Sequence, residues 1–129
     1  MSYYFSKIIK KKSFEAAVTL VTEGLKKEGF GVLSEINVQE TLKEKIDADF
    51  KRYTILGACN PHFAYKALQI EDKLGVFLPC NIVVEEHENG DVEVSAVDPI
   101  ASMSAVKNLS LKEIAAEVQQ KLRRVIENL

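Results

Sequence analysis

Two segments near opposite ends of the chain constrain the fold most, because each repeats apolar residues along one side of a helix. In residues 14–28 the repeat is Phe14, Ala17, Val18, Val21 and Leu25. In residues 111–128 it is Leu111, Ile114, Ala115, Val118, Leu122, Val125 and Ile126. A helix with a single apolar stripe has one surface to bury, and one face of a sheet accommodates two such helices most simply.

Strand-like segments lie between and beside these helices. They are residues 3–9, 30–36, 52–58, 75–86 and 92–96, rich in β-branched and aromatic types. Asn89-Gly90 separates the last two and is a strong hairpin signal. The order predicts an α+β fold in a single domain, residues 1–129. We expect a single, mostly antiparallel sheet of about five strands, with helices 14–28 and 111–128 packed on one face.

Polar residues at the predicted helix starts indicate how each helix is capped. Asn37 stands three residues before Glu40, and Ser110 three residues before Glu113, as in a capping box. Asn60 precedes Pro61, which predicts an Asn cap with proline in the first helical position.

Length and composition narrow the class of protein. The 129 residues suit one domain with its own core, and 47% are hydrophobic. The net charge of -2 gives no basic field, so we expect no nucleic-acid partner. No apolar run reaches the roughly 20 residues of a membrane span, and the start lacks signal-peptide features. We therefore expect a cytoplasmic protein whose two cysteines are reduced thiols.

Common catalytic and cofactor motifs are absent from the sequence. Neither glycine-rich phosphate loop fits the six glycines, and C-x-x-C, H-E-x-x-H and G-x-S-x-G do not occur. The sequence therefore implies no cofactor, assigns no catalytic residue, and favours a binding protein over an enzyme.

Cys59 and Cys80 are the most informative positions, since each is followed by an asparagine. Cys59 ends a strand just before a helix, where backbone N–H groups lower the pKa of a thiol. Cys80 follows Pro79, which interrupts an apolar strand. The plainer interpretation is that both are small buried hydrophobic residues.

A metal site is an alternative for these cysteines. His62 stands three residues after Cys59, so both side chains can face one ion in the first helical turn, with Cys80 as a third ligand. A closed zinc site needs four ligands, and the sequence names no fourth. His62 is otherwise a polar helix residue, and His87 is a neighbour of the hairpin turn.

Asp98-Pro99 opens a third segment of interest, residues 98–107. It follows a strand and is predicted to be irregular. Residues 98–107 are either a mobile cover over a pocket or an ordinary loop whose interior is filled by Met103.

These segments together resemble a known family. Gly57-Ala58-Cys59-Asn60-Pro61, Leu78-Pro79-Cys80-Asn81 and Asp98-Pro99 are similar to the signature of the domain of unknown function 302 family. The likeness covers nearly the whole chain. It implies a small α+β domain with a layout like that of the TATA-binding protein, and it carries no activity, substrate or cofactor. The motif positions are Cys59, Asn60, Pro61, Pro79, Cys80, Asn81, Asp98 and Pro99.

Three functions follow as hypotheses. The first is a small-ligand-binding module with a pocket near Cys59, Cys80 and Asp98, lined by the motif positions. The second is thiol redox chemistry or metal binding by Cys59 and Cys80, with His62. The third is an assembly domain, for which a homodimer is the expected form because symmetric dimers are the commonest oligomers.

Overall fold

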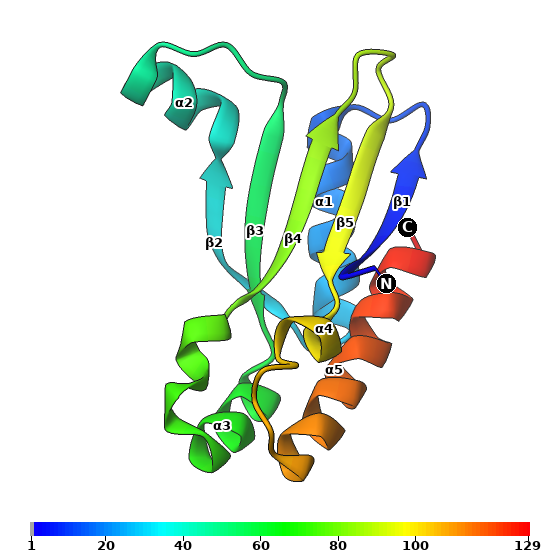
Figure 1. The fold of residues 1–129 in the computed structure, drawn as a ribbon. Helices are drawn as coiled ribbons and strands as arrows, with labels where there is room; N and C mark the ends of the chain where they lie inside the picture. Colours follow the sequence, from blue (N-terminus) through cyan, green and yellow to red (C-terminus); the bar gives the residue numbers. More distant parts are fainter. Residues whose placement is uncertain (1) are drawn as a thin grey trace.

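The structure is a computed structural model that describes residues 2–129 (Figure 1). Its elements in chain order are β1 (Tyr4–Ile9), α1 (Phe14–Lys27), β2 (Gly31–Asn37), α2 (Val38–Ile46), β3 (Tyr53–Cys59), α3 (Pro61–Ile70), the 3-10 helix η1 (Asp72–Phe77), β4 (Cys80–Glu86), β5 (Val92–Val97), α4 (Pro99–Ser102) and α5 (Leu109–Glu127).

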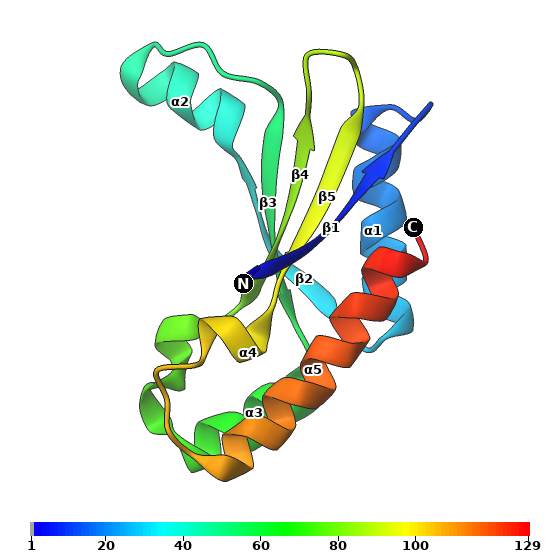
Figure 2. The ribbon, with the colours of Figure 1, turned by 45° about the vertical axis from the view of Figure 1, so that its right-hand side comes forward.

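The strands form one open sheet in the order β1-β5-β4-β3-β2, and each neighbouring pair is antiparallel. Helices α1 and α5 lie on the same side of this sheet (Figure 2). The predicted α+β class, with about five strands and two long helices on one face, is therefore confirmed. The layout also fits the one that the family resemblance implied.

Alternation along the central strands separates a buried face from an open one. Ile82 and Val84 of β4, and Val92 and Val94 of β5, are fully buried beneath the helices. The residues between them point to the other face and are exposed or half-buried. Helix α1 contributes its predicted apolar stripe to this core, as does α5. We call the uncovered side the open face.

The helix caps follow the sequence in one case and depart from it in another. The Asn37 Oδ1 accepts a hydrogen bond from the Glu40 backbone N–H at 3.0 Å, which confirms that cap. The prediction of a capping box at Ser110 was wrong. Helix α5 begins earlier, at Leu109, and Asn108 caps it by accepting from the Ser110 N–H. The segment after Asp98 also contains the short helix α4, where an irregular loop was expected.

The predicted strand over 75–86 begins later than the sequence suggested. Residues 72–77 form η1, and Val76 is 80% exposed instead of pointing into the core. The ladder with β3 starts only at Cys80, opposite Ala58. Pro79 has no backbone N–H to donate to a neighbouring strand, which explains why pairing begins just after it.

A second group of elements extends beyond the ends of β3 and β4. Helices α3 and α4, η1 and the first turns of α5 form this lobe, which lies below the sheet in Figure 1. It has its own small apolar cluster around Ala67, Leu74 and Leu111, with Met103 and Ile114 packed against it. Within residues 2–129, no helix combines the length and apolarity needed to cross a membrane.

Candidate functional site

A small cavity of about 40 Å³ lies where the sheet meets the lobe. The ends of β3 and β4 form one wall, and α3, η1 and α5 form the others. Among the lining side chains, Asn60 alone carries an amide or charged group, and Cys59 and Cys80 supply thiols. The remainder are apolar: Phe30, Ala58, Phe63, Ala64, Ala67, Leu74, Leu78, Pro79, Met103, Leu111, Ile114, Ala115 and Val118.

The two cysteines come together on this cavity. Cys80 is paired with Ala58, and Cys59 directly follows Ala58 at the end of β3, where both thiols line the cavity. Burial raises the pKa of the Cys80 thiol to about 11, and the nearby Cys59 adds to that shift. Burial raises the pKa of Cys59 as well. The predicted lowering of the Cys59 pKa was therefore wrong, because the apolar cavity desolvates a thiolate and so disfavours it.

Asn60 is buried, and its side chain makes no capping bond to α3. The predicted positions are confirmed, with Asn60 at the N-cap and Pro61 as the first residue of α3, but the expected capping hydrogen bond does not form. The Asn60 Nδ2 donates instead to the Glu28 carbonyl oxygen at 3.4 Å, just after α1. Gly29 makes room for this amide: a Cβ there would lie 3.1 Å from the Asn60 Nδ2, and the φ of +87° also favours glycine. Asn60 thus connects the end of α1 to the start of α3.

Asn81 and Pro61 do not line the cavity. Asn81 pairs with Gly57 on β3 and lies exposed on the open face, since neighbouring residues of a strand point to opposite sides. Pro61 is exposed at the start of α3. Pro79 lines the cavity and also covers Gly57, where a Cβ would lie 2.8 Å from the Pro79 Cγ.

The Asp98 segment reaches the cavity through a different residue from the one expected. The Asp98 Oδ1 accepts hydrogen bonds from the Ile100 N–H and from Gln119 Nε2, both at 3.0 Å. Asp98 thereby caps α4, and Pro99 after it is buried. Neither residue lines the cavity. Met103, at the end of the same short helix, does.

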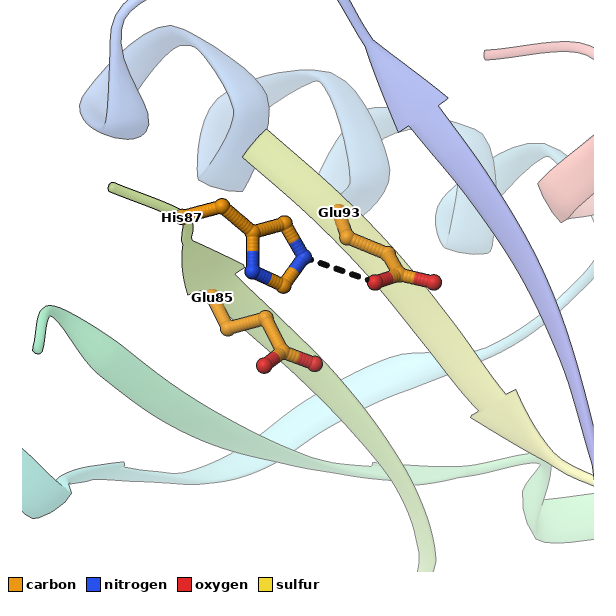
Figure 3. A group of neighbouring side chains, drawn as sticks. All are labelled: Glu85, His87 and Glu93. Carbon is orange, nitrogen blue, oxygen red and sulfur yellow. Dashed lines mark hydrogen bonds and ion pairs between the residues drawn. The ribbon is translucent and has the colours of Figure 1, made fainter. Parts of the chain in front are cut away.

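The predicted metal ligands do not assemble. His62 is exposed, and within the described chain Cys59, His62 and Cys80 form no group of three ligand atoms. The group that does form is Glu85, His87 and Glu93 (Figure 3).

From the sequence, His87 was interpreted only as a residue next to the hairpin turn. The His87 Nε2 lies 2.8 Å from the Glu93 Oε1. Hydrogen bonds from the Ser6 hydroxyl and from His87 lower the pKa of Glu93. The available signal was the Asn89-Gly90 hairpin, whose pairing places Glu85 opposite Glu93.

The fold and cavity define a class: small α+β domains in which two helices cover one face of an antiparallel sheet. The model of the family "Domain of unknown function DUF302" matches residues 5–129, and the chain belongs to that family. It is also similar to the crystal structure of an uncharacterized conserved DUF302 protein from Bacillus stearothermophilus. The identity is 32%, the TM-score is 0.90, and 98% of each chain is covered. No curated protein sequence matches the chain.

Proposed function

We propose that this domain binds a small, largely apolar molecule in the cavity between the sheet and the lobe. The observation that carries the proposal is the lining, in which every side chain except the Asn60 amide and the two thiols is apolar. Binding pockets for small molecules have this composition, with a few polar groups that fix orientation. Asn60 is the group that would orient a ligand.

Met103 supports a route by which the cavity can grow. An outer groove of about 430 Å³ shares Met103, Leu111 and Ala115 with the cavity. Met103 therefore stands between the two spaces, and its unbranched side chain changes conformation easily. The 40 Å³ of the closed cavity is smaller than the roughly 150 Å³ of an engineered cavity that holds benzene. Displacement of Met103 would join the cavity to the groove and admit such a molecule.

An NMR titration with benzene as the probe tests this proposal. We expect amide shifts centred on Cys59, Cys80 and Met103. Met103→Ala should strengthen binding, because it joins the cavity and the groove, and Ala64→Leu should abolish it by filling the space.

Ala16→Leu is the matched control, since Ala16 is exposed on α1. Its benzene affinity should equal that of the wild type. Shifts confined to the open face, or equal binding by Ala64→Leu and Ala16→Leu, would reject the cavity as the site.

Thiol chemistry is the second candidate, because both cysteines line one cavity. Its weakness is electrostatic. A pKa of about 11 for Cys80, compared with 9.0 for an ordinary thiol, lowers the thiolate fraction at neutral pH roughly a hundredfold. We expect iodoacetamide at pH 7 to alkylate both cysteines more slowly than a free thiol, with Cys80 the slower. Faster alkylation of Cys59 than of a free thiol would favour the thiol function instead.

Self-association and a cytoplasmic location stay predictions from the sequence. An assembly role requires a homodimer, which sedimentation equilibrium over a range of protein concentrations would detect. A monomer at every concentration would remove the assembly hypothesis and leave ligand binding unaffected.

A further inference from the structure

A second cluster of chemically capable side chains lies on the open face, far along β4 from Cys80. Glu85 is in β4, His87 follows the end of that strand, and Glu93 is in β5. One ligand atom from each lies within 4.8 Å of the others. Figure 3 shows the His87 ring beside both carboxylates, with its Nε2 directed at Glu93.

The pairing of β4 with β5 brings two negatively charged side chains together. Glu85 and Glu93 are direct partners in the β4–β5 ladder. Like charges directly opposite each other on a sheet destabilise the pair. The Lys51 Nζ neutralises one of them, at 2.6 Å from the Glu85 Oε1. The two carboxylates and this ammonium still leave one net negative charge beside the His87 ring, which attracts a cation.

Each carboxylate is held in place from outside the group of three. Ser6 of β1 donates its hydroxyl hydrogen bond to the Glu93 Oε2, which leaves the Oε1 facing His87. Lys51 occupies one oxygen of Glu85 and leaves the other uncommitted to that ion pair. Outer hydrogen bonds of this kind orient the ligands of metal sites.

An open groove adjoins the cluster. It has a volume of about 330 Å³, and Glu85 and Glu93 form part of its wall. Tyr53, Asn81 and Ser95 bring further groups able to hydrogen-bond, and the rest of the wall is Tyr3, Tyr4, Val83, Ala96 and Val97. An ion with three protein ligands keeps at least one position for water or a ligand, and this groove gives that position room.

We propose that Glu85, His87 and Glu93 bind a divalent transition-metal ion, with Zn²⁺ as the representative ion. One imidazole and two carboxylates are a mixed nitrogen and oxygen set, which suits Zn²⁺ and its neighbours better than Ca²⁺ or Mg²⁺. The ion takes the place of the hydrogen bond between His87 and Glu93: the Nε2 lone pair binds the ion, and the single proton of the imidazole then lies on Nδ1.

The experiment measures Zn²⁺ affinity of the full chain by competition with a chromophoric indicator. His87→Ala should weaken binding at least tenfold. His62→Ala is the matched control, because His62 is the other histidine and is exposed, and its affinity should equal that of the wild type. Lys51→Gln should strengthen binding, since it removes the competing cation from Glu85.

Co²⁺ gives a readout that does not depend on variants. Its absorption spectrum should lack a thiolate charge-transfer band, and its paramagnetic broadening of amide signals should centre on residues 85–93. A thiolate band, broadening centred on Cys59 and Cys80, or equal Zn²⁺ affinity in the wild type and His87→Ala would overturn the proposal. None of these results bears on benzene binding in the cavity, so the two proposals fail separately.

Discussion

The packed core beneath the sheet and the lobe beyond its end are both apolar, yet they are built differently. The core joins the long helices α1 and α5 to four fully buried residues of β4 and β5, Ile82, Val84, Val92 and Val94. The lobe uses short elements, has three buried residues in its cluster and borders a cavity. Close packing allows one arrangement, whereas a small cluster beside a void can rearrange. The difference assigns stability chiefly to the core and makes the lobe the region that the proposed ligand binding would use.

The largest expected effect comes from truncating one leucine in each region. Leu122 of α5 lies in the core and Leu74 of η1 in the lobe, and both are at most 1% exposed. Leu122→Ala should lower the free energy of unfolding by about 2–5 kcal/mol. Leu74→Ala should lower it less, because the lobe can collapse around the change. Urea denaturation followed by circular dichroism measures both, and equal losses would contradict the comparison.

The next effect concerns Cys80, at the border of the two regions. Its folded-state pKa of about 11 exceeds the ordinary value of 9.0, so folding favours the protonated thiol. This contribution is complete below pH 9 and is lost as the pH rises from 9 to 11, by about 3 kcal/mol.

Cys80→Ala removes that alkaline loss. The stability difference between wild type and variant should therefore shrink between pH 9 and pH 11, as measured by urea denaturation at each pH. A difference that stays constant over this range would show that Cys80 is not desolvated as described.

A smaller effect is expected where Pro79 of the lobe border packs on the sheet. A Cβ on Gly57 would lie 2.4 Å from the Ser34 Oγ and 2.8 Å from the Pro79 Cγ. Gly57→Ala should therefore destabilise the protein by roughly 1–3 kcal/mol through overpacking. Gly75→Ala is the control, since a Cβ at Gly75 meets nothing within 4 Å. Thermal unfolding compares the two variants. Similar melting temperatures would contradict the tight packing of Pro79 on Gly57.

The smallest effect tests the link between the two regions. The Asn60 amide joins the lobe to the end of α1 through the Glu28 carbonyl. Asn60→Ala should lower the free energy of unfolding by about 1 kcal/mol, the usual contribution of one hydrogen bond. Asn81→Ala, in the exposed copy of the Cys-Asn pair, should change it by less than about 0.5 kcal/mol. Urea denaturation would refute the link if both variants behaved alike.

Periodicity in the sequence predicted the architecture well, for a physical reason. The apolar stripes of α1 and α5 and the alternation in β5 record burial directly, so the layers follow from them. The error over residues 75–86 arose because alternation does not record where strand pairing begins, and here the ladder with β3 starts only at Cys80. In η1, Leu74 is buried while Val76 is exposed.

The candidate sites were harder to predict, because they depend on register and burial. Cys59 was expected to be activated by a helix end, but the depth of the apolar cavity decides its pKa and no local pattern records that depth. Cys80 and Asn81 were grouped together although alternation within a strand already separates adjacent residues. The Glu85–Glu93 pair follows from the register between β4 and β5, which the periodicity of either strand alone does not record.

The separation of Cys80 from Asn81 has a consequence for how the chain tolerates insertions and deletions. Loss of one residue within β4 would turn the strand over, placing the Asn81 amide in the apolar cavity and the thiol in solvent. The same loss in residues 47–49, directly after α2, would shorten a connection on the surface. Length changes should therefore be accepted in that connection and rejected within β4.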